Sequence, residues 1–285
     1  MTEVETDRLD YRGAIPYAML HLAPLAVFLV GWTPLAVAAC FFSYFLRMFG
    51  ITAGYHRYFS HRAYQTTRLF QFVLAVLGAT AGQNGPLWWA AHHRHHHRHA
   101  DTEQDPHSPG LRGFLWSHTV WFLTYRSSKT NLEAVRDLAR YPELHLFERH
   151  PHKTTWIYAF CWFFLGIFIE TRMPFLGTTR WQLLVWAYFV STIMVYHGTF
   201  TINSLSHIYG SRRYETRDSS RNNVWLALIT LGEGWHNNHH RYPGSERQGF
   251  FWWELDLTHL ALKALERLGL VWGLREPPKS VLNRI

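Results

Sequence analysis

Two long stretches of this 285-residue chain, residues 13–46 and 181–211, contain no Lys, Arg, Asp or Glu, and they restrict the fold more than any other feature. A helix that crosses a bilayer needs about 20 apolar residues, so the first stretch has room for two crossings, with a Gly-Trp-Thr-Pro reversal at 31–34. A third apolar run covers residues 154–169. The sequence therefore predicts an all-α integral membrane protein with four transmembrane helices, over residues 14–31, 34–52, 154–171 and 181–203.

The remaining residues, 53–153 and 204–285, are predicted to form one histidine-rich helical cap on these helices, so that residues 1–285 make a single membrane domain. Within the cap, residues 69–82 are apolar but shorter than a crossing. This segment favours a helix at the membrane interface, with a fifth crossing as the alternative. Four crossings are preferred, because an even number keeps all polar clusters on one side.

The distribution of Lys and Arg predicts the orientation. The chain is rich in both between the second and third predicted crossings and after residue 211, whereas the two reversals carry only Arg172 and Arg180. By the positive-inside rule, the termini and the cap face the cytoplasm. The net charge of +8 suits anionic headgroups or an acidic substrate headgroup. Nucleic-acid binding is disfavoured, because the basic residues flank apolar runs and no recognition motif accompanies them.

Histidines gather in three places beside the predicted crossings. In the tract at 90–109, His93, His96 and His97 are spaced i, i+3, i+4, so in a helix they lie on one face and are expected to converge on a common centre. His236, His239 and His240 repeat this spacing. His56 and His61 are five residues apart, which is roughly 140° on a regular helix and too far to chelate one ion from one face. They are therefore expected to serve two neighbouring ions, or the helix ends between them.

The number of imidazoles exceeds what one tetrahedral or octahedral ion uses, which points to a pair of metals. Zinc accepts imidazole but has no redox chemistry, whereas iron accepts the same ligands and activates oxygen. Uncharged ligands leave the metal charge uncompensated, so nearby carboxylates are useful as acceptors of the free imidazole N–H. The candidates for this role are Asp101, Glu103, Asp105, Asp218 and Glu233.

Taken together, these boxes resemble the membrane-bound fatty acyl desaturases of the delta-9, stearoyl-CoA type. The first box is His-x-x-x-x-His (His56 and His61). The second and third boxes are both His-x-x-His-His (His93, His96 and His97; His236, His239 and His240). The resemblance also includes Asn-x-x-x-His at Asn203 and His207. It extends to Asp105-Pro106-His107 and Gly232-Glu233-Gly234. The combined pattern is highly specific, although no single box is.

The resemblance implies four crossings with a cytoplasmic cap and two iron ions, with Asn203 reaching one of them through water. It also implies O2-dependent introduction of a cis double bond near the middle of a long saturated acyl chain, with electrons from an external ferredoxin or cytochrome. The predicted metal ligands and catalytic residues are His56, His61, His93, His96, His97, His207, His236, His239 and His240.

In that family a tryptophan and a threonine bend the acyl tunnel at the reacting carbons, and Trp89 and Thr199 stand at the matching positions; Asn84 is a further predicted substrate contact. A hydrogen bond from the indole N–H to the threonine hydroxyl is expected on chemical grounds. The acyl-CoA enzymes carry an Arg and an Asp where this chain has Ala91 and His92, so acyl-CoA and acyl-lipid substrates both stay open.

Two other functions use some of the same features. A membrane hydroxylase has the same metal platform and differs only in the fate of the substrate radical. A histidine-rich metal transporter is less favoured, because it needs polar ligands within the crossings, whereas these clusters lie beyond the ends of the apolar runs.

Overall fold

The computed structural model describes residues 7–282. Within them, four helices are long and apolar enough to cross a membrane, as the charge-free runs predict, and they identify a membrane protein: Tyr11–Val30, Pro34–Ser60, Lys153–Arg172 and Arg180–His207. Their segments are α2 (Tyr11–Leu22), η1 (Ala23–Ala26), α3 (Val27–Val30), α4 (Pro34–Phe49), η2 (Gly50–Ser60), α10 (Lys153–Arg172), α11 (Arg180–Leu183), η7 (Leu184–Val190), α12 (Ser191–Asn203) and η8 (Leu205–His207).

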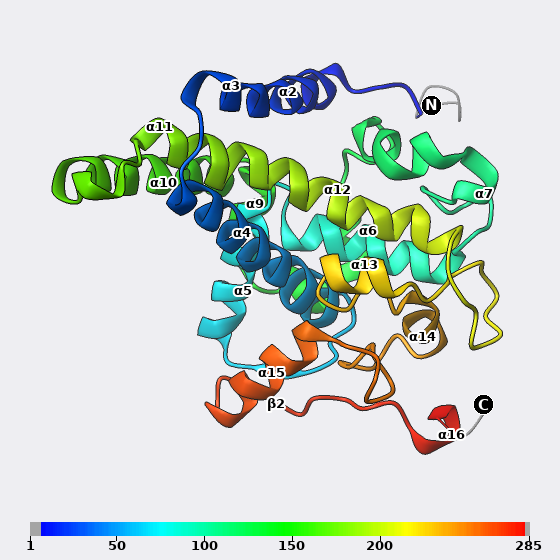
Figure 1. The fold of residues 1–285 in the computed structure, drawn as a ribbon. Coiled ribbons are helices and arrows are strands. Elements are labelled where there is room, and N and C mark those ends of the chain that lie inside the picture. Colours follow the sequence, from blue (N-terminus) through cyan, green and yellow to red (C-terminus); the bar gives the residue numbers. More distant parts are fainter. Residues whose placement is uncertain (1–6, 283–285) are drawn as a thin grey trace.

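The two reversals between these helices lie together at one end of the bundle. Gly31 adopts a positive φ of 68°, which ends α3, and the Thr33 side chain accepts a hydrogen bond from the N–H of Ala36 at the start of α4. The Thr33 and Thr178 hydroxyls are 2.8 Å apart, which joins the first reversal to the second. The longer polar segments between and after these helix pairs therefore meet at the opposite end, where α6, α7 and α14 lie (Figure 1).

Outside these helices, the chain forms short helices and one two-stranded sheet in which Gln65 pairs with Trp272 and Thr66 with Val271. The strands are β1 (Gln65–Thr66) and β2 (Val271–Trp272), and the helices are α5 (Arg68–Thr80), α6 (Pro86–His99), α7 (Pro109–Arg112), η3 (Trp116–Val120), η4 (Trp121–Leu123), η5 (Leu132–Val135), α8 (Arg136–Ala139), α9 (His145–Arg149), η6 (Pro174–Leu176), α13 (Val224–Ile229), α14 (His236–Arg241), α15 (Leu257–Arg267) and α16 (Lys279–Leu282). The apolar segment predicted at 69–82 is α5, whose 13 residues are too few to cross a bilayer.

Arg47 lies fully buried on α4. Its guanidinium donates to the Thr192 hydroxyl at 2.7 Å, to the Ser191 hydroxyl and to the Tyr188 carbonyl at 3.4 Å, and it lies over the ring of Tyr158. A charge in a membrane helix is costly unless it is paired or solvated by polar groups. These contacts therefore fasten α4 to the fourth membrane helix through the interior of the bundle.

The second membrane helix changes its winding where it enters the cap. The segment η2 is a π-helix, with hydrogen bonds from residue i+5 to residue i, such as the one from the His61 N–H to the His56 carbonyl. Its glycines allow α5 to cross closely, because a Cβ on Gly50 would lie 2.6 Å from the Leu77 carbonyl carbon. On the α5 side, a Cβ on Gly78 would overlap the buried ring of Tyr55.

We expect Gly78→Ala to lower the free energy of unfolding by about 1–3 kcal/mol, because the added methyl group forces the Tyr55 ring out of a filled core. The measurement is the unfolding temperature in one detergent. Gly13→Ala is the matched control, since a Cβ at Gly13 meets no atom within 4 Å. Equal unfolding temperatures for the two variants would contradict this packing.

Candidate metal centre

Nine histidine side chains lie in two groups inside the cap. In each group, one nitrogen atom per residue lies within 4.8 Å of the corresponding atoms of the other members. The five-histidine group is His56, His61, His93, His97 and His239. The four-histidine group is His96, His207, His236 and His240. These are the nine histidines that the sequence boxes single out, and each group has the donor atoms to hold a metal ion.

Each His-x-x-His-His box divides between the two groups, so the expected convergence of one box on a common centre is wrong. On α6, His93 and His97 belong to the five-histidine group and His96 to the other. An α-helix places residue i+4 about 40° to one side of residue i and residue i+3 about 60° to the other. Each box therefore directs its i, i+4 pair to one centre and its remaining histidine to the second.

His56 and His61 belong to the same group, which corrects the expectation based on a regular helix. The π-helical winding of η2 has i→i+5 hydrogen bonds, which stacks residues five apart instead of separating them. Their ring centroids are 4.8 Å apart. The expectation that they serve two ions is wrong because it assumed α-helical winding. The alternative, that the helix ends between them, is confirmed, since η2 ends at Ser60.

Within the five-histidine group the ring nitrogens face one another. The Nε2 atom of His93 is 2.8 Å from that of His61 and 3.0 Å from that of His97, and the Nε2 atom of His239 is 2.9 Å from His97 and 3.1 Å from His56. With the single N–H of each neutral imidazole on Nδ1, these Nε2 atoms bring lone pairs together. A cation between the rings would satisfy all of them.

Burial keeps most of these rings uncharged and thus able to bind a metal. Burial, reinforced by neighbouring imidazoles, lowers the pKa of His61, His93, His97, His236 and His239 well below the usual range. For His96, burial lowers the pKa, but the adjacent Asp105 carboxylate outweighs it and holds the pKa above its usual value. The donor set therefore fits a metal whose charge replaces the missing protons.

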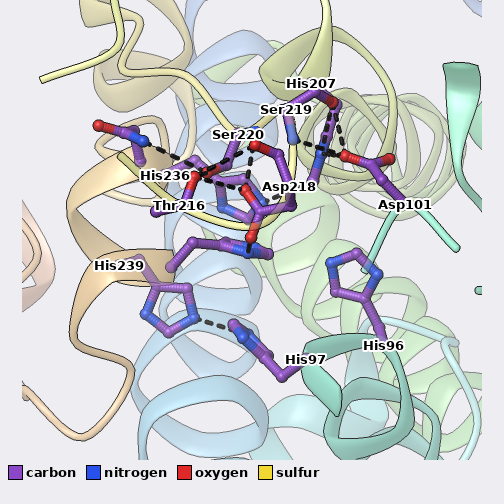
Figure 2. A network of polar contacts seen from close by, with 12 residues as sticks. His96, His97, Asp101, His207, Thr216, Asp218, Ser219, Ser220, His236 and His239 are labelled. Atoms are coloured by element: carbon purple, nitrogen blue, oxygen red, sulfur yellow. Dashed lines mark hydrogen bonds and ion pairs between the residues drawn. The ribbon is translucent and has the colours of Figure 1, made fainter. Parts of the chain in front are cut away.

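Four carboxylates contact the outer nitrogen of four of these rings. Glu233 lies 2.5 Å from Nδ1 of His56, Asp105 lies 3.1 Å from that of His96, Asp101 lies 3.2 Å from that of His207, and Asp218 lies 2.8 Å from that of His240. Figure 2 shows Asp101 bonded to His207 and Ser219, and Asp218 held by Thr216 and Ser220. Such contacts fix the ring orientation and leave Nε2 free for a metal. Glu103, the fifth candidate, is exposed.

A cavity of about 660 Å³ borders the five-histidine group at His93. Its walls come from α2, the segment at 123–128, α6 and the fourth membrane helix. Its lining includes Asn84, Trp89, His93, Thr199, Asn203, Thr155, Trp156 and Tyr188. A smaller cavity of about 40 Å³ lies against His56, His96 and His236. Trp89, Thr199 and Asn203 line both, so all three predicted substrate contacts and Asn203 lie along this route.

The hydroxyl of Thr199 has partners other than the indole of Trp89. It donates to the Val195 carbonyl at 2.9 Å and accepts from the Gln83 side chain at 3.1 Å. Among the described residues no hydrogen bond joins Thr199 to Trp89, so the expected pairing is wrong in this structure. The reason is that a threonine within a helix bonds readily to the carbonyl four residues earlier.

Sequence reasoning missed three residues around His56. The Gln248 side chain lies 3.2 Å from His56 Nδ1 and donates to Glu233 at 2.7 Å. Arg57 is buried and donates to Glu233 at 3.0 Å and to Asp256 at 3.0 Å. Gln248 and Asp256 follow the third box without forming a motif of their own. Arg57 is one of many basic residues near the apolar runs, and nothing in the sequence distinguishes it from the others.

Four further histidines were not among the predicted ligands. His107 is buried beside His96, with ring centroids 4.3 Å apart, and His96, Asp105 and His107 form a third set that could hold a metal. Separately, His197 lies 3.0 Å from His118 and 3.2 Å from His21, away from both groups. Single histidines in apolar runs carry no spacing signal, which explains why His21 and His197 were not singled out.

Comparison with known proteins decides the family. Residues 30–273 match the family model described as fatty acid desaturase. The chain belongs to the fatty acid desaturase family. This confirms the resemblance, and the desaturase is an oxidoreductase.

The desaturase is similar to several proteins named for delta-9 desaturation. It is 34% identical over 277 residues to the sn-1 stearoyl-lipid 9-desaturase of Anabaena variabilis, covering 96% of each chain. It is 35% identical over 272 residues to the protein of the same name from Synechocystis sp., covering 93% of this chain and 80% of that one. It is 33% identical over 292 residues to the delta-9 acyl-lipid desaturase 1 of Arabidopsis thaliana, covering 100% and 90%.

We expect His96→Ala to lower the metal bound by the purified desaturase to about half, because only the four-histidine group loses a donor. Metal content per chain is measured by mass spectrometry after removal of free ions. His95→Ala is the matched control, since His95 lies on the same helix and turns outward to the Gln104 carbonyl, 2.9 Å away. Equal metal loss in both variants would contradict the assignment of His96 to a metal-holding group.

Proposed function

We propose that this desaturase uses two iron ions, O2 and external electrons to introduce a cis double bond of the delta-9 type into a long saturated acyl chain. The observation that carries the proposal is that a small cavity touching both histidine groups shares Trp89, Thr199 and Asn203 with the long cavity. When bound, the iron ions would activate O2 for removal of two hydrogens from an unactivated carbon chain. The hydroxylase alternative is not favoured, because the named relatives are desaturases.

The residues of the chain have distinct parts in this proposal. The nine histidines hold the metals, four carboxylates orient their rings, and Asn203 lies where it can hold water beside the four-histidine group. Trp89 and Thr199 position the acyl chain, because both line the long cavity and the small one between the metal groups. The narrow walls exclude bulk water from the reacting carbons.

We favour an acyl chain esterified to a membrane lipid over acyl-CoA. The named relatives act on stearoyl-lipid or acyl-lipid. His92, at one of the positions where acyl-CoA enzymes carry a charged headgroup contact, lines the cavity and is bonded at 2.9 Å to the Trp88 carbonyl of its own helix. The membrane helix α2 supplies one wall of the cavity through Gly13, Pro16 and Tyr17, which lets a lipid-linked chain approach from the bilayer side.

The cap and both termini are proposed to face the cytoplasm, because Lys and Arg concentrate in the cap and are sparse at the two reversals. A ferredoxin or cytochrome would deliver electrons one at a time from that side. The net charge of +8 favours association with an acidic carrier.

We expect expression of the desaturase in a host that lacks unsaturated-fatty-acid synthesis to produce monounsaturated chains with the double bond at carbon 9. Lipids are analysed by gas chromatography and mass spectrometry, with intact-lipid, CoA and acyl-carrier fractions separated before hydrolysis. The new double bonds are expected first in the intact-lipid fraction. His96→Ala abolishes the product, and His95→Ala retains it. Hydroxylated chains without unsaturation would contradict the proposed reaction, and first appearance in the CoA fraction would contradict the proposed carrier.

A further inference from the structure

The two histidine groups differ in the charge that surrounds them. In the four-histidine group, three of the four rings contact a carboxylate through Nδ1: His96 with Asp105, His207 with Asp101 and His240 with Asp218. Among residues 7–282, the five-histidine group has one such contact, that of His56 with Glu233. Three negative charges therefore lie directly behind one group and one lies behind the other.

Two guanidiniums lie near the five-histidine group. The single carboxylate of the five-histidine group, Glu233, is shared with the buried guanidinium of Arg57 at 3.0 Å. A second guanidinium, that of Arg94, donates at 2.9 Å to the carbonyls of Phe59 and Ser60, directly before His61 in the sequence. Arg57 also pairs with Asp256 at 3.0 Å and Glu246 at 3.6 Å, and Arg94 pairs with Asp137 at 2.7 Å, so neither guanidinium is a free positive charge. The difference between the two groups therefore lies in the carboxylates that contact the rings directly, three against one.

The carboxylates of the four-histidine group are held by uncharged donors. Asp101 accepts from the N–H and hydroxyl of Ser219, and Asp218 accepts from the Ser220 N–H at 3.0 Å (Figure 2). Among residues 7–282, no Lys or Arg forms an ion pair with Asp101, Asp105 or Asp218. Arg212 reaches only the backbone carbonyl of Asp218 and is exposed. These three negative charges are therefore not cancelled locally.

Negative charge behind a ligand has two effects on a metal. It makes the imidazole a stronger donor, and it attracts additional positive charge strongly where water is excluded. Both effects favour the higher oxidation state of the ion. From this charge distribution we propose that Asp101, Asp105 and Asp218 make the four-histidine group the one that holds the more readily oxidised of the two iron ions. This proposal rests on the proposed di-iron function, and the three aspartates act in it as positioning residues.

The consequence is an ordered one-electron oxidation. When a one-electron oxidant such as ferrocenium is added to the reduced protein, Fe²⁺ in the four-histidine group loses an electron to it first, giving Fe³⁺ and ferrocene. The ion in the five-histidine group is oxidised second. We expect the two equilibrium constants to differ by at least about tenfold, which is about 59 mV for a one-electron couple.

The test uses the full chain in detergent, loaded with ⁵⁷Fe, reduced anaerobically with dithionite, freed of excess reductant and oxidised stepwise with a ferrocenium salt. Mössbauer spectra at each step count ferrous and ferric iron. The wild type is expected to oxidise in two resolved steps of one iron each. A single step in which both ions change together would overturn the proposal.

Two variants, each lacking one negative charge, show which histidine group is oxidised in which step. Asp218→Asn is expected to bring the two steps closer together, because it raises the potential of the first ion. Glu233→Gln is expected to move them further apart, because it raises the potential of the second. Asp101→Asn repeats the Asp218→Asn prediction at another ring and serves if that variant loses iron. Glu143→Gln, which breaks a peripheral pair with Arg68, is the control and leaves both steps unchanged.

The proposal is supported if Asp218→Asn narrows the separation between the two oxidation steps and Glu233→Gln widens it. It is overturned if both variants change the separation in the same direction, or if Asp218→Asn widens it and Glu233→Gln narrows it. Failure of the proposed function can be told apart from failure of this proposal. A chain that binds no iron or forms no double bonds contradicts that function, whereas a chain that binds two equivalent irons and still forms double bonds contradicts only the proposed difference between the groups.

Discussion

Uncharged imidazole nitrogens from separate segments of the chain meet within hydrogen-bond distance inside the cap, and the remainder of the structure depends on holding them there. With Nε2 unprotonated, as metal binding requires, close pairs such as His61 and His93, 2.8 Å apart, bring lone pairs together in a buried place. A cation resolves this repulsion, but only if the four segments η2, α6, η8 and α14 are already fixed by other contacts. The metal groups therefore require a rigid cap, and most of the cap's polar contacts serve that purpose.

The fixing contacts are directional and buried. Between the histidines of the third box, Asn237 accepts from the N–H groups of Arg213 and Tyr214 at 2.8 Å, and Asn238 donates to Glu254 at 2.9 Å. The helix that carries the second box is held at its N-terminus by Glu148, which accepts from the N–H groups of Leu87 and Trp88. Removing one such partner leaves buried polar groups unsatisfied, so the ring positions depend on residues outside the boxes.

Much of this architecture was predictable from the sequence, because its signals are local. Charge-free runs predicted four membrane helices, since the length needed to cross a bilayer is fixed by the lipid. Histidine spacing predicted the residues that gather at the two groups. Of the five acidic candidates for ring partners, all but the exposed Glu103 contact a ring: Asp101, Asp105, Asp218 and Glu233.

Other features depended on contacts between distant segments. Spacing within one helix fixes the angles between side chains, but it does not tell which of two centres each ring meets, so the division of His96 from His93 was missed. The π-helical winding around His56 has no counterpart in the histidine spacing, which was interpreted on a regular α-helix. Gln248 reaches His56 from nearly two hundred residues away, and no spacing rule encodes such a contact.

The central claim is that nine histidines form two separate metal positions that share one cavity. The most direct test is an anomalous difference map from crystals of the iron-loaded enzyme, recorded on both sides of the iron absorption edge. The account predicts two peaks, one surrounded by His56, His61, His93, His97 and His239, and the other by His96, His207, His236 and His240. A single peak between the groups, or iron bound elsewhere, would contradict it.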